Sequence, residues 1–182
     1  MSEKARKPAL LIIDMINSFD FDHGPTLAEK TFVITDPILK LKQTFNKREL
    51  PVIFINDHYN LWKADFEKII EHCRNELSSP IFKKLIPHDD DYFLIKPKHS
   101  AFYGTALNTL LRQLRVDTLI LTGIAGNICV LFTANDAYMR EYHLVIPEDC
   151  IASNNDQDND YTLKMMRNVL GANTNKSTEQ NF

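Results

Sequence analysis

Three residues with reactive side chains, Asp14, Lys96 and Cys129, stand at the ends of short apolar runs. Asp14 follows the run 9–13, Lys96 closes a second run, and Cys129 comes one short turn after a third run at 118–123. If these runs are parallel strands, their carboxyl ends meet at one edge of the sheet, where ligands bind. A carboxylate, an amine and a thiol that meet there are the components of an activated cysteine nucleophile.

The segment 121–130 places Cys129 near the start of a helix. Unpaired backbone N–H groups and the helix dipole favour an anion at that position, so we expect a stabilised thiolate, and a nearby Lys96 would lower the pKa of the thiol further. Asp14 can accept the thiol proton and later hand it to a leaving amine. The same backbone N–H groups are candidates for an oxyanion hole. These residue types therefore predict acyl transfer through a cysteine.

The elements that must position these residues alternate between short apolar runs and segments of helical period, which is typical of βαβ units. Because crossovers between parallel strands are right-handed, helices cover both faces of such a sheet. The predicted fold class is therefore α/β, a three-layer, doubly wound, mainly parallel sheet with helices on both faces (Rossmann-like). The predicted strands are 9–14, 51–56, 92–96, 118–123 and 143–147, and the predicted helices are 35–47, 62–73, 105–115, 127–140 and 157–169.

Composition favours one globular domain. The chain has 182 residues, of which 44% are hydrophobic, enough for a full core over residues 1–170. The remaining segment 171–182 is rich in Asn, Thr, Ser and Lys, and we expect it to be disordered. The net charge of −3, with dispersed basic residues, argues against a nucleic-acid or anionic membrane surface. No run is apolar enough to span a bilayer and the N-terminus lacks a signal peptide, so we expect a cytoplasmic protein.

The three cysteines are widely and irregularly spaced, which argues against a disulfide framework and against a zinc cluster. No Cys-x-x-Cys is present, so a redox thiol protein ranks last among the functions considered. We expect Cys73 and Cys150 to be small buried hydrophobic residues. A reactive Cys129 should be alkylated much faster than either of them near neutral pH.

Three motifs in order carry a family resemblance. They are Asp-Met-Ile-Asn-Ser-Phe at 14–19, Lys-Pro-Lys-His-Ser-Ala-Phe at 96–102 and Thr-Gly-Ile-Ala-Gly-Asn-Ile-Cys-Val at 122–130. With them the chain resembles the isochorismatase-like cysteine hydrolase superfamily from about residue 8 to 170. Ile16 stands where Gln is frequent, which removes an amide that can orient substrate or loop, and Glu141 stands where Gly often ends the nucleophile helix.

The resemblance implies an isochorismatase-like fold and a catalytic triad of Asp14, Lys96 and Cys129, with Lys96 selected over Lys98 by its distance from the Ser-Ala-Phe segment. It implies a non-proline cis peptide between Ile124 and Ala125 that turns the Ala125 and Cys129 N–H groups toward an oxyanion. The implied reaction is hydrolysis of a C–N bond in a small amide or carbamoyl compound through a thioester, with the water activated by Asp14.

Residues after the second strand lie at the predicted active edge, where they can line a substrate pocket. The candidate substrate-binding residues are Phe19, Asn56, Asp57, His58, Tyr59, Trp62 and Phe102. Trp62 can equally anchor its helix to the core. The nicotinamidase branch of the resembled family holds a metal with Asp-x-His at this place. Asn56-Asp57-His58 departs from that pattern, so we expect no metal and no cofactor.

Two other functions stay open. Siderophore-type isochorismatases hydrolyse a vinyl ether without using the cysteine, and a non-catalytic homologue would bind a small metabolite or a protein partner. The complete set of Asp14, Lys96 and Cys129 favours C–N hydrolysis over both. The expected partner is a small-molecule substrate, with no nucleic acid and no membrane, and the exposed helix faces leave a homo-oligomer open.

Overall fold

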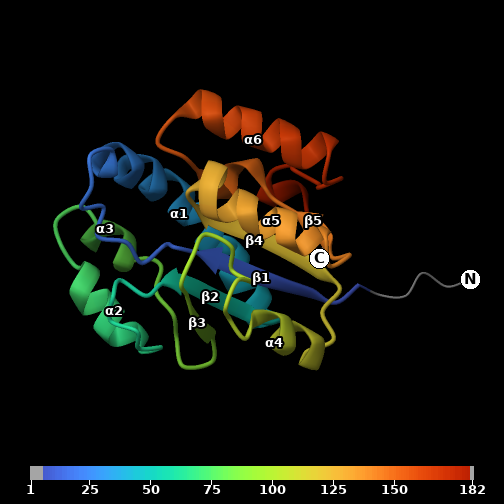
Figure 1. Cartoon of the computed structure of the whole chain (residues 1–182), viewed down its shortest axis with the longest axis horizontal. Coiled ribbons are helices and arrows are strands. Elements are labelled where there is room, and N and C mark those ends of the chain that lie inside the picture. The colour runs from blue at the N-terminus through green and yellow to red at the C-terminus, as the bar shows by residue number, and fades with distance from the viewer. Residues whose placement is uncertain (1–5, 181–182) are drawn as a thin grey trace, which may run out of the picture.

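The computed structural model describes residues 6–180, which fold around a parallel sheet (Figure 1). The order of the strands is β3-β2-β1-β4-β5, and a short β6 pairs with β4. β1 lies at the centre because its six residues are all buried and pair on both sides, with Ile13 opposite Ile55 of β2 and Gly123 of β4. The strands are β1 (Pro8–Ile13), β2 (Val52–Asp57), β3 (Tyr92–Lys96), β4 (Thr118–Ile124), β5 (His143–Val145) and β6 (Ile151–Ala152).

Two apolar cores lie on opposite faces of the sheet, because successive residues of a strand point to opposite sides. Leu10 and Ile12 pack in the core under α1, α2 and α3, whereas Leu11 and Ile13 pack in the core under α4, α5 and α6. This confirms the predicted three-layer α/β class. The helices are α1 (Gly24–Lys47), α2 (Phe66–Cys73), α3 (Ser79–Phe82), α4 (Leu107–Gln113), α5 (Leu131–Tyr138) and α6 (Asp156–Asn168), with short turns η1 (Gly126–Val130), η2 (Glu148–Cys150) and η3 (Ser177–Glu179).

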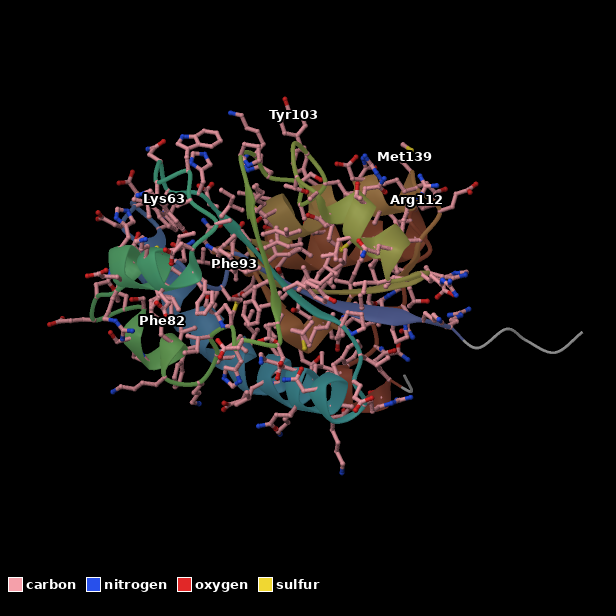
Figure 2. The ribbon with its side chains drawn as sticks, turned by 90° about the horizontal axis from the view of Figure 1, so that it is seen from below. Lys63, Phe82, Phe93, Tyr103, Arg112 and Met139 are labelled. Carbon is pink, nitrogen blue, oxygen red and sulfur yellow. The ribbon has the colours of Figure 1, made fainter. Side chains whose placement is uncertain are left out.

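Figure 2 shows the two sides of the sheet by the side chains that it labels. Phe82 and Phe93 lie on the side of α2 and α3, and Arg112 and Met139 lie on α4 and just after α5 on the other side. Phe93 is in edge-to-face contact with Phe66, which ties β3 to the start of α2. No helix in the described part of the chain has both the length and the apolar character needed to cross a membrane.

α1 is longer than predicted. The sequence places its start at residue 35, because Pro37 is typical of a first helical turn, but the helix begins at Gly24 and Pro37 lies inside it. The additional turns are held because Leu27, Thr31 and Ile34 continue the buried face of the later residues. This extension brings the N-terminal end of α1 to the edge of the sheet where Asp14 lies.

α2 is shorter than predicted. It begins at Phe66, with the Asp65 side chain accepting a hydrogen bond from the Lys68 N–H as its N-cap. Trp62 therefore does not belong to the helix, and its backbone has a left-handed φ of 52°. Its side chain is 65% exposed, so it does not anchor the helix to the core either.

The prediction of a disordered tail is wrong for residues 171–180; residues 181–182 lie outside the described part. Asn173 pairs with Val145 at the edge of the sheet, and its backbone exchanges hydrogen bonds with Leu144 and Ile146. Ala172 and Thr174 are buried. The prediction failed because it used the polar side chains of this segment, whereas its backbone groups form the hydrogen bonds that extend the sheet beside β5.

Candidate active site

Asp14 is held at the carboxyl end of the central strand by its neighbours on both sides. Its N–H donates to the Ile55 carbonyl, and its Oδ1 accepts a hydrogen bond of 2.9 Å from the Asp57 N–H. Its backbone has a φ of 52°, and its side chain is buried. A carboxylate that is fixed in this way presents its second oxygen, Oδ2, to the site.

The side chain of Lys96 reaches from the end of β3 to Asp14 at the end of β1, although these two strands are not adjacent. β2 separates β3 from β1, and adjacent strands lie about 4.8 Å apart, so only a long side chain at the end of β3 reaches Asp14. The Lys96 Nζ lies 2.8 Å from Asp14 Oδ2 and 3.5 Å from the Cys129 Sγ. Burial lowers the pKa of Lys96, but the electrostatic contributions of Asp14, Cys129 and Asp57 and the hydrogen bond to Asp14 together outweigh burial, and the pKa is raised. Lys96 is therefore an ammonium ion that contacts both other residues.

The pKa of the Cys129 thiol is raised, contrary to the sequence-based expectation of a stabilised thiolate. Burial is the largest cause, the Asp14 carboxylate adds to it, and the opposing charge of Lys96 does not compensate for the two. The sequence could not reveal this balance because it gives neither the depth of the thiol nor the ion pair that neutralises Lys96. The resting residue is a protonated thiol, so attack on a carbonyl requires a base.

The turn that carries Cys129 follows directly from β4. The peptide bond between Ile124 and Ala125 is cis, as the family resemblance implies. The next residues form the π-helical turn η1, and the backbone N–H of Val130 donates to the Ala125 carbonyl across it. Gly123, with a φ of 109°, lies so close to the Ile13 carbonyl that a Cβ there would be 2.1 Å from the oxygen. Only glycine allows β4 to pack against β1 and turn toward Cys129 at this point.

A cavity of about 520 Å³ opens at this edge of the sheet. Asp14, Lys96 and Cys129 line it together with Ala125, so the three predicted catalytic residues and both predicted oxyanion residues meet in one place. The volume falls within the ordinary range of small-molecule sites.

Of the seven candidate substrate-binding residues, Asp57 and Tyr59 line this cavity and the other five do not. Phe19 and Phe102 are buried in the two cores instead. Asn56 is fully buried and bonds the backbone of Ile16 twice, accepting from its N–H at 3.1 Å and donating to its carbonyl at 2.7 Å. Asn56 thus holds the backbone of the loop after β1.

His58 and Trp62 stack on one another at the surface, with their ring centroids 3.9 Å apart. Neither lines the cavity. The reason is the irregular, left-handed backbone at residues 59, 60 and 62, which turns the segment after β2 outward. Tyr59, by contrast, lines the cavity and donates its hydroxyl hydrogen to the Ile16 carbonyl at 3.0 Å.

Further lining residues received no role from the sequence. His23 directly precedes α1 and Leu27 lies in its first turn, and the sequence predicts no helix there, so nothing signalled them. Asn154 follows β6, an element that was not predicted. His99 could have been found from the sequence, because it lies inside the conspicuous segment 96–102. Its Nδ1 lies 3.9 Å from the Cys129 Sγ.

The remaining cysteines lie apart from this chemistry. Cys73 and Cys150 are free and fully buried, as expected, and burial raises the pKa of the Cys73 thiol to about 12. Within residues 6–180 no group of three or more His, Cys, Asp or Glu side chains gathers in a way that could hold a metal ion.

Comparisons with known proteins match this geometry. Residues 8–178 match the Isochorismatase domain family. The chain is 63% identical over 164 residues to the uncharacterised isochorismatase family protein YaaI of Bacillus subtilis strain 168, a match that covers 90% of this chain and 91% of the relative.

Two solved structures share the fold over nearly all of their length. N-carbamoylsarcosine amidase from Thermoplasma acidophilum has a TM-score of 0.75 and 31% identity, covering 97% of this chain and 99% of that one. The nicotinamidase SaPncA from Staphylococcus aureus has a TM-score of 0.73 and 26% identity, covering 94% and 98% respectively. The family match over most of the chain, and a cysteine beside a lysine and an aspartate at the carboxyl edge of the sheet, make this protein a member of the isochorismatase-like cysteine hydrolase family.

Proposed function

We propose that this protein is a cysteine amidase that cleaves a C–N bond in a small amide or carbamoyl compound. The observation that carries the proposal is the contact of the Cys129 thiol with Lys96, which is itself paired with Asp14 in an open cavity. The names of the two related structures, an N-carbamoylsarcosine amidase and a nicotinamidase, support C–N hydrolysis as the reaction class.

The reaction begins with transfer of the thiol proton to Asp14, which the raised pKa of Cys129 makes necessary. The Sγ then forms a bond to the carbonyl carbon, and the charge that develops on the oxygen is stabilised by the N–H groups of Ala125 and Cys129. Collapse of this intermediate breaks the C–N bond, and Asp14 returns the proton to the departing amine. Lys96 holds the carboxylate and the sulfur in place throughout. A water molecule then hydrolyses the thioester.

The charge of the cavity favours an uncharged substrate. Asp20 and Asp57 line it, whereas the charges of Asp14 and Lys96, which also line it, neutralise one another. A substrate carboxylate would therefore meet like charges. We expect the methyl esters of maleamate and oxamate to release ammonia faster than the free acids, and the reverse order would contradict this.

The test of the function is ammonia release from a panel of nicotinamide, N-carbamoyl amino acids, ureido acids, maleamate, oxamate and the two esters. Release by the native protein and its abolition in Cys129→Ala, with an unchanged circular dichroism spectrum, is the expected result. Activity that persists in Cys129→Ala would exclude the nucleophile and point to cysteine-independent hydrolysis. Silence across the panel, in a protein whose circular dichroism spectrum shows it to be folded, would favour the binding homologue.

A further inference from the structure

His99 is the only imidazole among the described residues that contacts the sulfur of Cys129 in the structure, with Nδ1 lying 3.9 Å from Sγ. It lines the cavity beside Asp14 and Lys96, yet its exposure to solvent is quite different from theirs. Asp14 is 5% and Lys96 1% exposed, whereas His99 is an exposed residue. The sulfur therefore lies between an interior ion pair on one side and an imidazole in contact with solvent on the other.

The position of His99 is fixed by the same helix that follows Cys129. Thr133 donates to the Cys129 carbonyl at 2.7 Å, and its Oγ1 accepts a hydrogen bond of 3.0 Å from the Ala101 N–H. Ser100 donates to the carboxylate of Asp136 on α5. Because the residues directly after His99 are bonded to this helix, the backbone of His99 is held close to Cys129, and its ring also contacts Phe132 of α5.

The two candidate bases beside Cys129 differ in their access to the open side of the cavity. Both oxygens of Asp14 already accept hydrogen bonds, one from Lys96 and one from the Asp57 N–H, and both donors lie in the interior of the site. Water that attacks a thioester on Cys129 enters from the open side of the cavity, where His99 lies. An imidazole there can take a proton from water and exchange it with solvent.

We propose that His99 is the general base of thioester hydrolysis, a role that rests on the proposed amidase function. Nδ1 accepts a proton from water while the water oxygen bonds to the acyl carbon. The C–S bond then breaks, its electron pair returns to Sγ, and His99 passes the proton to the sulfur. The step consumes one water and one thioester and yields one acid and one thiol, so no other reactant is needed. Asp14 is therefore the base in formation of the thioester, and His99 is the base in its hydrolysis.

The test follows the acyl-enzyme in full-length protein. His99→Phe keeps an aromatic ring against Phe132, whose ring lies 5.5 Å from the imidazole, and His99→Gln keeps a polar side chain. With any amide that the native protein turns over, both variants should lose about 10²-fold or more in kcat. KM should fall in parallel, so that kcat/KM, which reports acylation, changes little. Intact-protein mass spectrometry during turnover should show the added mass of the acyl group, and mass spectrometry after digestion should place it on the peptide that contains Cys129.

Two controls separate this role from a structural one. Hydroxylamine is a stronger nucleophile than water and should restore turnover in both His99 variants by releasing the acyl group as a hydroxamate. Lys98→Gln changes the neighbouring exposed residue, which does not line the cavity, and should behave as the native protein. Loss of kcat/KM together with kcat, without an acyl-enzyme and without rescue by hydroxylamine, would show that His99 only shapes the site.

The outcomes also distinguish the two proposals. If the native protein releases ammonia and the His99 variants do so equally fast, the role of His99 is overturned and the amidase function stands. If the native protein forms no acyl-enzyme and releases no ammonia from the panel, the amidase function fails and the role of His99 fails with it. Accumulation of the thioester in both variants, with rescue, supports both proposals.

Discussion

The reactivity of Cys129 depends on two opposite charges at close range. The charge of Lys96 favours the thiolate, whereas the charge of Asp14 disfavours it. Burial also disfavours the thiolate, and its effect on the pKa of Cys129 is larger than that of either charge. In the native protein the two charges are paired at 2.8 Å, so their effects on the sulfur largely cancel and burial dominates. In the proposed reaction the thiol becomes a nucleophile when Asp14 takes its proton.

This balance predicts that Asp14→Asn makes the thiol more reactive to alkylation while it stops turnover. Removing the negative charge lowers the pKa of Cys129, because Lys96 is then unopposed, so a larger fraction is thiolate at a given pH. The rate of iodoacetamide labelling at Cys129, followed against pH by peptide mass spectrometry, should rise near neutral pH in the variant.

Asp20→Asn is the matched control, since Asp20 lines the cavity but is not among the main causes of the raised pKa of Cys129. Its labelling rate should equal that of the native protein. Slower labelling in Asp14→Asn, in a protein whose circular dichroism spectrum shows it to be folded, would contradict the role of Asp14 in setting this pKa.

At the scale of the elements, the site depends on how closely β4 packs on β1. Gly123 and Gly171 both have positive φ, which costs an alanine about 1–2 kcal/mol, but their surroundings differ. A Cβ at Gly123 would overlap the Ile13 carbonyl, and a Cβ at Gly171 would meet nothing within 4 Å. Gly123→Ala should therefore lower the free energy of unfolding by more than about 4 kcal/mol, an exceptional value for one substitution.

Urea unfolding of the two glycine variants measures this difference. Gly171→Ala should lose only the about 1–2 kcal/mol that belongs to its backbone conformation. Equal losses in the two variants would mean that β1 and β4 can separate to admit a methyl group, and that the contact does not determine the geometry of the turn before Cys129.

The hydrogen bonds of Thr133 link α5, Cys129 and the segment that carries His99. Thr133→Val keeps the shape of the side chain but leaves the N–H of Ala101 without its acceptor, in a place where both residues are fully buried. Such an unsatisfied group costs about 1–3 kcal/mol. We expect this loss in urea unfolding, together with reduced turnover.

The control for Thr133 is Thr44→Val. Thr44 donates to the Lys40 carbonyl on an exposed face of α1, where water replaces the lost partner. Its substitution should change stability by no more than about 0.5 kcal/mol. A similar loss in both variants would assign the effect to the helical propensity of valine rather than to the link with Ala101.

At the scale of the whole molecule, the C-terminal segment completes the edge of the sheet. Besides the pairing of Asn173 with β5, the Asp149 carboxylate accepts two hydrogen bonds from Ser177, one from its N–H and one from its hydroxyl. An unpaired edge strand is a site of aggregation, and this segment covers one. Figure 1 shows the last coloured residues returning beside β5 and under α6.

Deletion of residues 171–182 should therefore destabilise a protein whose active site lies at the other strands. We expect a loss of at least about 2 kcal/mol from the missing buried residues and hydrogen bonds. For a chain of this size that lowers Tm by roughly 4–8 °C, measurable by calorimetry. Thr178→Ala, at an exposed position of the same segment, should leave Tm unchanged. A deleted protein with the native Tm would show that the segment does not contribute to stability.

The sequence by itself determined the α/β class, the positions of the main strands and the identity of three residues at strand ends. These follow from local patterns: buried parallel strands are continuous apolar runs, and a polar residue at the end of such a run is conspicuous. The motifs at 14–19, 96–102 and 122–130 added the family resemblance and the cis peptide before Ala125, which the structure confirms.

Only the tertiary structure decided which residues form the walls of the site. Asn56 and Phe102 lie at or after the ends of predicted strands, where the sequence predicts a substrate pocket, yet both side chains are buried in the protein. Leu27 and Asn154, by contrast, line the cavity but come from segments that the sequence did not place there. The direction of a side chain in a loop is set by its backbone and by contacts distant in the chain, and residue spacing contains neither. The same holds for the pKa of Cys129, because burial and the charges that surround a group are properties of the folded chain.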